Sequence, residues 1–144
     1  MSFNSYTDSV ALTFKTNAMS AIDITSSIGV EPDSFINAGE SVRTTYGSVF
    51  KTGLQSWSLW TREYEIETVN DSCGIEAKVI EIIELCEPHK SFIGNILGSG
   101  GVADIQVRLV GDHNIGDTFS AVTLNRLSGL GMSLSIEVFP ASSS

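Results

Sequence analysis

The chain has 144 residues, a length that suits one domain and leaves little room for two. Hydrophobic residues make up 42% of it, so we expect a folded globular protein that needs neither a disulfide nor a metal to hold its core. The net charge of −9 argues against nucleic acid and anionic membranes as partners, because both are bound through clustered Lys and Arg.

The acidic balance would suit a basic protein partner, although solubility alone also explains it. The opening residues MSFNSYTDSV lack the basic and apolar regions of a secretory signal. No apolar run approaches the roughly 20 residues of a membrane-spanning helix. Two cysteines, Cys73 and Cys86, are too few for a disulfide framework, so we expect reduced thiols and a cytoplasmic protein.

The N-terminal part predicts a strand followed by a short helix. Residues 10–15 alternate between apolar and polar side chains, as a half-buried strand does. Ser20 and Asp23 have the spacing of a capping box, which predicts that a helix starts there. Gly29 is a natural end for this helix, and Pro32 prevents its continuation.

Both tryptophans lie in the next predicted strand. Residues 33–52 read as a polar loop with a weak β-hairpin around Tyr46 and Gly47, and SWSLWTREYEIE then alternates like a strand. Strand geometry places Trp57 and Trp60 on opposite faces. We expect Trp57 to face the helices and anchor the core. Trp60 then points to the open face, unless the 33–52 loop covers it.

A long amphipathic helix follows, capped by Asn70, Asp71 or Ser72 and stopped by Pro88. Its glutamates mostly lie away from the apolar stripe, which consists of Ile75, Val79, Ile82, Ile83 and Cys86. SFIGNILGSGG predicts a second, short helix that ends in glycines. Cys73 and Cys86, if both are helical, lie about 20 Å apart and cannot pair.

The C-terminal part predicts a strand, a helix and a last strand. VADIQVRLV and MSLSIEVF both alternate, and Asp117 or Thr118 is the expected cap of the helix between them. Alternation in every strand indicates one covered and one wet sheet face. We therefore expect a single α+β domain over residues 1–144, a sandwich with a mostly antiparallel or mixed sheet of four to six strands. Its helices pack on one face, its ordered core covers about residues 9–139, and residues 1–7 and 140–144 are flexible.

Three segments of the chain have a familiar order. They are VALTFKTNAMSAIDITSSIGVEP, then SWSLWT, then ELCEPHKSFIGNIL with LSGLGMSLSIEVF near the end. Together they resemble the bacterial family called domain of unknown function 4279, over roughly residues 9–139. Trp57 falls on that family's Trp, and Gly29, Glu31 and Pro32 fall on its G-x-E-P, whereas Trp60 departs from the pattern. The resemblance implies a compact α+β domain and brings no catalytic residues with it.

Tests for chemistry give no catalytic, cofactor or metal residues. His89 and His113 lie in different predicted loops, and no CxxC is present. DHNIGDT resembles a calcium loop but has glycine at position five instead of six, and Thr123 stands where a bidentate Glu belongs. GSGG follows a helix and lacks the Lys-Ser/Thr of a phosphate loop. Cys86 reads as core, and Cys73 lacks a placed base.

The candidate interaction surface consists of Trp60, Tyr64, Glu31 and Tyr46. Three functions remain open. The first is a non-enzymatic protein- or ligand-interaction domain that could form homo-oligomers through a sheet face or edge. The second is an immunity-type protein that neutralises a basic toxin. The third is a small-molecule binder or unrecognised enzyme with a pocket under the 33–52 loop.

Overall fold

A computed structural model describes residues 8–39, 41–43, 49–54, 57–66, 74–111 and 116–140, with residues 41–43 and 49–54 described by their backbone alone. The predicted flexible segment 1–7 lies outside these residues, as do residues 141–144 of the predicted flexible tail 140–144 and Tyr46, Gly47, Cys73 and His113. The strands are β1 (Ser9–Thr16), β2 (Ser34–Ile36), β3 (Ser41–Arg43), β4 (Val49–Leu54), β5 (Ser58–Glu65), β6 (Val102–Val110) and β7 (Ser133–Phe139). The helices are α1 (Ala21–Ile28), α2 (Ile75–Cys86), α3 (Lys90–Gly98) and α4 (Ala121–Gly129), and a 3-10 turn, η1 (Glu87–His89), joins α2 to α3.

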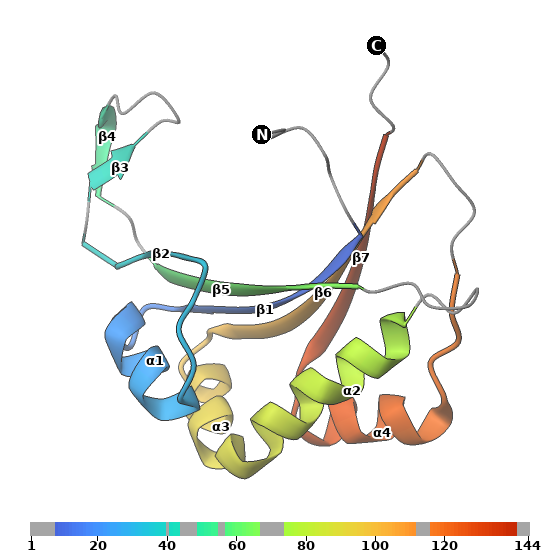
Figure 1. Cartoon of the computed structure of the whole chain (residues 1–144). Coiled ribbons are helices and arrows are strands. Elements are labelled where there is room, and N and C mark those ends of the chain that lie inside the picture. Colours follow the sequence, from blue (N-terminus) through green and yellow to red (C-terminus); the bar gives the residue numbers. More distant parts are fainter. Residues whose placement is uncertain are drawn as a thin grey trace.

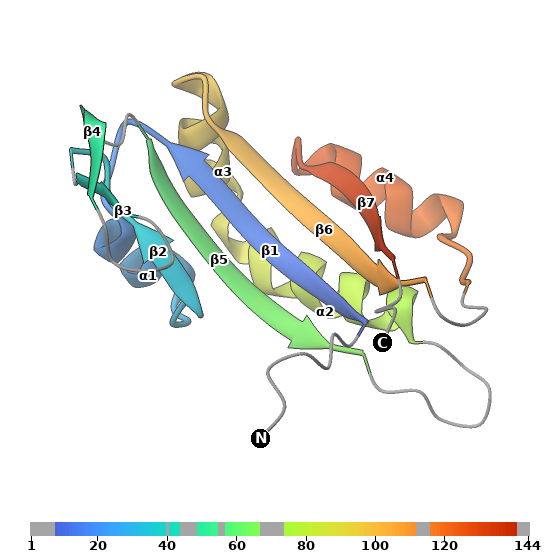
Figure 2. The ribbon, with the colours of Figure 1, turned by 90° about the horizontal axis from the view of Figure 1, so that it is seen from above.

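The main sheet has five strands in the order β2-β5-β1-β6-β7. Its pairs are antiparallel except β6 and β7, which run parallel because α4 carries the chain back between them. Figure 2 looks onto this sheet, with β2 at one edge and β7 at the other. The mixed sheet of four to six strands is therefore confirmed.

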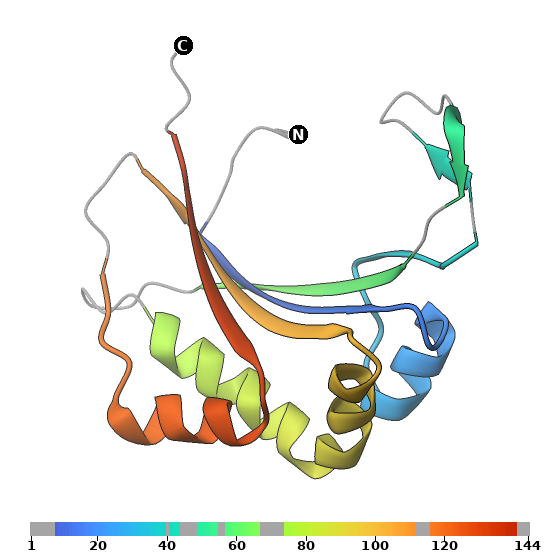
Figure 3. The ribbon, with the colours of Figure 1, turned by 180° about the vertical axis from the view of Figure 1, so that it is seen from behind.

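The helices form a single layer beneath the sheet. Figures 1 and 3 show α1, α2, α3 and α4 on the same side, while the opposite sheet face carries no helix. The β3–β4 hairpin, a separate antiparallel pair, stands beyond the β2 edge on the side away from the helices. The predicted α+β architecture with helices on one face is confirmed, and so is a β-hairpin on either side of Tyr46 and Gly47, although β4 runs past residue 52 to Leu54.

The core lies between the sheet and the helices, and aromatic rings fill its centre. Phe14 and Trp60 are both fully buried, and their ring centroids lie 5.5 Å apart. Phe92 of α3 meets Phe14 edge-on at 5.9 Å between centroids. Such tilted contacts suit the ring quadrupoles and add to the burial energy. Strand β5 and helix α3 are thus joined through β1.

The predicted faces of the two tryptophans are wrong. Trp60 has an exposed fraction of 0% on the helix side, and its indole N–H donates to the Thr25 hydroxyl of α1 at 3.0 Å. Trp57 lies on the opposite face, where the Lys15 ammonium sits 5.2 Å from its ring centroid. Ser58 explains the error, because this polar residue is only 1% exposed and its hydroxyl accepts a bond from an approaching backbone N–H. Helix α1 covers Trp60, and Phe35 from the start of the 33–52 segment pairs beside it.

Helix α1 begins and ends as its sequence predicts. The Asp23 carboxylate accepts the backbone N–H of Ser20 at 3.1 Å, which completes the capping box. Gly29 ends the helix in the left-handed region at φ 88°, a conformation that glycine adopts without a Cβ penalty. The chain then turns directly into the segment that leads to β2.

Helices α2 and α4 complete each other's N-termini. The Asp117 carboxylate, just before α4, accepts the backbone N–H of Glu76 in α2 at 2.8 Å. The Glu76 carboxylate in turn accepts the backbone N–H of Ser120 at 2.6 Å and the Thr123 hydroxyl at 2.8 Å. These bonds lower the pKa of Glu76, the backbone bond from Ser120 most of all. Each helix therefore depends on an acid from outside its own first turn.

The predicted caps of both helices are wrong for this reason. Gly74, not residues 70–72, is the N-cap residue of α2, and residues 70–72 themselves lie outside the described residues. Ser120 caps α4 in place of Asp117 or Thr118, with its hydroxyl accepting from Thr123 N–H at 3.2 Å.

The apolar stripe of α2 is buried as predicted, from Ile75 to Cys86. Burial raises the pKa of the Cys86 thiol to about 12, so the thiolate is not available at neutral pH. Pro88 falls in η1 and ends the α-helical hydrogen bonding of α2, after which α3 starts at once.

Candidate functional site

The edge of the sheet at β2 is built by three local features. Pro32, shortly after α1 ends, disfavours a helical conformation at Glu31, which lies in neither a helix nor a strand. Strand β2 then pairs with β5 so that Phe35 lies beside Trp60. At its far end the Asn37 side-chain oxygen accepts the backbone N–H of Ala21 at 2.7 Å. This bond ties β2 to the first residue of α1, and the two elements enclose a hollow between them.

That hollow is a pocket of about 430 Å³. Pockets that hold small ligands span roughly 300–1,000 Å³, so its size is sufficient for one. Its walls come from one helix and one extended segment, and its lining residues are Ala21, Ile22, Thr25, Glu31, Pro32, Phe35 and Asn37.

The walls of the pocket carry large apolar side chains that face solvent. Ile22 of α1 is 71% exposed, and Phe35 of β2 is 55% exposed. Neither belongs to the core, since the buried face of α1 is formed by Ala21, Ile24 and Ile28. Exposed apolar groups that line one concave surface are typical of binding sites.

Polar groups of the pocket come from Thr25 and Glu31. The Thr25 hydroxyl accepts the Trp60 indole N–H. Among the described residues the same hydroxyl donates no hydrogen bond, so its O–H can serve a ligand. The Glu31 carboxylate is exposed and forms no ion pair or hydrogen bond with the residues that the structure describes. The pocket thus offers one hydroxyl donor and one carboxylate that has no ion-pair or hydrogen-bond partner among the described residues.

Arg62 holds the Glu31 segment in place. Its guanidinium donates to the Glu31 backbone oxygen at 2.7 Å and lies 5.3 Å from the Tyr64 ring centroid. Burial raises the pKa of Tyr64, against the opposing effect of the Arg62 charge. The Arg62 Nε is itself buried and has no hydrogen-bond partner among the described residues, which points to a position fixed by packing. Glu31 and Tyr64 are therefore brought together, with Arg62 between them.

The residues of the predicted interaction surface lie in different surroundings where the structure describes them. Glu31 lines the pocket, while Tyr64 is partly buried beside Arg62 on the helix side of β5. Trp60 is a core residue and supports the pocket from behind through Thr25. Tyr46 lies outside the described residues.

Sequence reasoning missed Ile22 and Phe35. The sequence did contain a signal for Ile22. This large apolar residue lies outside the buried face of its helix, which consists of Ala21, Ile24 and Ile28. Phe35 lies in a three-residue strand too short to show an alternating pattern.

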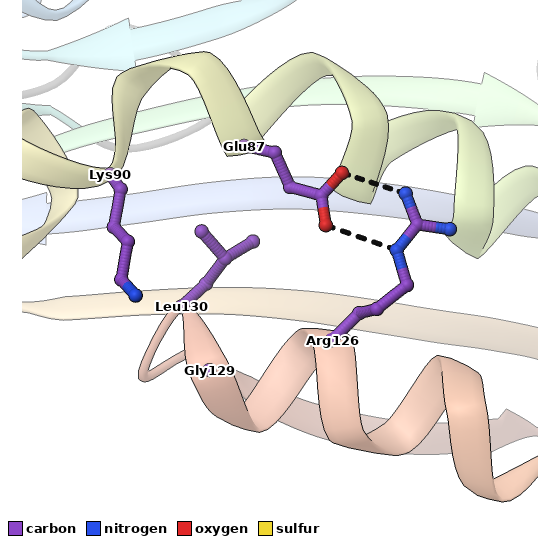
Figure 4. A pocket seen from close by; sticks show the side chains of 5 residues that line it. All are labelled: Glu87, Lys90, Arg126, Gly129 and Leu130. Carbon is purple, nitrogen blue, oxygen red and sulfur yellow. Dashed lines mark hydrogen bonds and ion pairs between the residues drawn. The ribbon is translucent and has the colours of Figure 1, made fainter.

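A second hollow of about 320 Å³ lies between η1 and α4. Figure 4 shows Glu87 and Arg126 joined across it by two parallel hydrogen bonds, with N···O distances of 3.0 and 2.7 Å, while Lys90 and Leu130 line its other side. The bonds from Arg126 lower the pKa of Glu87. Because Glu87 and Arg126 already form an ion pair with each other, we interpret this hollow as part of the packing between η1 and α4 and not as a ligand site.

Two further findings concern the described residues as a whole. They contain no group of three or more His, Cys, Asp or Glu side chains able to hold a metal ion. Among the same residues, no helix is long and apolar enough to span a bilayer.

Comparison with known families gives one match. The model of the family described as a domain of unknown function, DUF4279, matches residues 4–139. Neither the curated proteins nor the solved structures gave a match.

Proposed function

Since the chain belongs to the DUF4279 family, whose description assigns no activity, we propose a function from its own geometry: a non-enzymatic binding domain whose site is the pocket between α1 and β2. One observation carries the proposal. Ile22 and Phe35 stay largely exposed in the walls of a cavity that also holds the Glu31 carboxylate, which has no ion-pair or hydrogen-bond partner in the described part of the chain.

The lining of the pocket indicates the chemistry of its ligand. An apolar body would cover Ile22 and Phe35, and each buried CH₂ group would contribute about 0.8 kcal/mol. A cationic group would meet the Glu31 carboxylate, and an acceptor would meet the Thr25 hydroxyl. The ligand is therefore an organic cation with an apolar body. A Lys or Arg beside an apolar side chain supplies the same chemistry, as on a basic toxin bound by an immunity-type protein.

A binding role fits this pocket better than a catalytic one. Glu31 is the one ionisable side chain among the seven residues that line it. General acid–base or nucleophilic catalysis needs a second group placed beside the first. The described thiol, Cys86, lies in the core with its pKa raised to about 12.

Calorimetric titration with two ligands of equal size and opposite charge tests the proposal. The probes are 3-phenylpropylammonium and 3-phenylpropionate. We expect saturable binding of the ammonium compound and none of the carboxylate, because only the cation matches Glu31. Binding of the carboxylate with equal affinity would contradict the assigned ligand class.

Matched variants separate the pocket from the general acidity of the chain. Phe35→Ala and Glu31→Gln should each weaken binding of the ammonium probe by at least about fivefold, which corresponds to about 1 kcal/mol. The controls are Val122→Ala, an exposed apolar residue of α4, and Glu65→Gln, an exposed acid of β5. If all four variants bind like the wild type, the cation is attracted by net charge and the pocket is not its site.

A further inference from the structure

Strand β7 is the long edge of the sheet, and the described strands pair with it on one side only. It pairs with β6 and has no other partner among the described strands. Figure 2 shows it beside β6 at one side of the sheet. It has seven residues, whereas the strand at the opposite edge, β2, has three. A long edge presents a row of backbone donors and acceptors that another strand can use.

The side chains of β7 add an apolar surface to this edge. Leu134 packs against the core, and Ile136 and Val138 follow on the same face by strand alternation. The helix layer does not cover these two residues, which are 59% and 64% exposed. Leu124 of α4 is exposed as well.

The usual protection of an edge strand is weak in β7. Native edges carry Lys, Pro or inward-pointing charges that discourage pairing. Between Ser133 and Phe139 there is no Pro and no Lys, and the one charge is that of Glu137.

We propose that two copies of the chain pair through β7, antiparallel about a twofold axis at Ile136, and so join their sheets into one. In this register Ile136 faces Ile136 of the second copy. Leu134 faces Val138, and Glu137 faces Ser135. Both exposed apolar side chains of one copy are then covered by apolar side chains of the other.

The register explains why a second copy suits this edge. Apolar residues meet apolar residues, and Glu137 meets a hydroxyl, so no two acids stand directly opposite. A basic partner would gain little here, because the edge has one acid. The contact is a single strand pairing, smaller than the roughly 1,200–2,000 Å² of stable interfaces, so a dissociation constant on the order of micromolar is expected.

One repulsion remains in this dimer. The Ser135 hydroxyl donates to the Asp104 carboxylate at 2.9 Å, so Glu137 of one copy approaches Asp104 of the other. Burial already raises the pKa of Asp104, and Glu137 of its own chain adds to that effect. Glu137→Gln should therefore tighten the dimer severalfold, while Ile136→Lys should abolish it at 100 μM protein.

Disulfide trapping tests the axis directly, in a background with Cys73→Ser. Residues opposite one another in an antiparallel pair have Cα atoms about 4.5–5.5 Å apart, within disulfide range. Ile136→Cys should therefore form a cross-linked dimer under mild oxidation. Val138→Cys is the matched control, because its two copies lie four residues apart along the strand, roughly 13–14 Å.

Three outcomes would overturn the proposal. Equal cross-linking by both cysteine variants would contradict the register, and its absence in both would contradict the pairing. Sedimentation equilibrium that finds the wild type monomeric at 500 μM would do the same. Circular dichroism of Ile136→Lys should match that of the wild type, which shows that loss of the dimer is not loss of the fold.

Discussion

The two edge strands of the sheet, β2 at one end of the strand order and β7 at the other, expose large apolar side chains in different surroundings. At the β2 end, Ile22 and Phe35 line a hollow together with a carboxylate. At the β7 end, Ile136 and Val138 lie along a long edge strand that has one partner, β6, among the described strands. Exposure alone does not distinguish the two. The concave surface with a fixed charge suits a small ligand, and the open backbone suits another strand.

The open sheet face between these ends is polar and largely satisfied within itself. Arg108 forms an ion pair with Glu63 and donates to the Gln106 side chain at 2.7 Å. Ser135 donates to Asp104 on the neighbouring strand. The sequence had suggested a contact surface on this face, centred on Trp60. The structure places the large exposed apolar side chains mainly at the two ends.

The largest expected effect concerns the β2 end. Trp60→Ala should lower the free energy of unfolding by about 3–5 kcal/mol, because it empties a fully buried site and breaks the bond to Thr25. Trp57→Ala, on the open face, should cost about 1 kcal/mol or less. Urea denaturation measures both. Equal losses would show that α1 is not anchored through Trp60.

A pair of glycines compares the ends directly. Gly29 (φ 88°) leads from α1 towards the pocket, and Gly131 (φ 73°) leads from α4 into β7. Alanine at either site should cost about 1–2 kcal/mol for the left-handed backbone. Gly131→Ala should cost more, because its Cβ would lie 2.7 Å from a Leu97 methyl, while Gly29 has open space. Thermal unfolding of both variants would reveal a reversed order.

Low pH should weaken the contact between the N-termini of α2 and α4, which depends on the Glu76 carboxylate. The folded pKa of Glu76 is lowered by its bonds to Ser120 and Thr123, so its contribution is fully present above the unfolded pKa of about 4.3. That contribution is lost as the pH falls through the folded value. Glu76→Gln should therefore be less stable than the wild type at pH 7, and this difference in stability should shrink as the pH falls below about 4.3 and through the lowered folded pKa. A gap independent of pH would contradict the assigned role of the carboxylate.

The smallest expected effect is on monomer stability at the two exposed sites. Phe35→Ala and Ile136→Lys should each change the free energy of unfolding of the monomer by about 0.5 kcal/mol or less, since both side chains are largely exposed. Dilute samples, at about 1 μM, keep the measurement on the monomer. A loss above about 2 kcal/mol in either variant would mean that the residue belongs to the core and not to a binding surface.

Local patterns predicted the parts of the fold that depend on local chemistry. The Ser20–Asp23 capping box, the stop at Gly29 and the stripe of α2 follow from spacing alone, and all are confirmed. The α+β class followed from alternation in the strands.

The remaining predictions were wrong where contacts between residues far apart in the sequence decide the structure. Asp117 caps a helix that begins 42 residues before it, a contact that no local pattern encodes. The faces of Trp57 and Trp60 were undecided by period, because both faces of β5 carry large apolar groups. Which tryptophan faces the core depended on Ser58. This residue can be buried because its hydroxyl accepts the backbone N–H of Ala38. A pocket was expected under the 33–52 loop, and the pocket between α1 and β2 includes Phe35 and Asn37 from the start of that segment, while its other wall, α1, was not foreseen.

Mapping by ¹H–¹⁵N NMR of the 3-phenylpropylammonium complex tests the difference between the two ends most directly. The account predicts that backbone amide shifts gather in residues 21–37, around the α1–β2 pocket, and leave residues 133–139 of β7 unchanged. Shifts along β7, or shifts spread over the acidic surface without a maximum at the pocket, would contradict it.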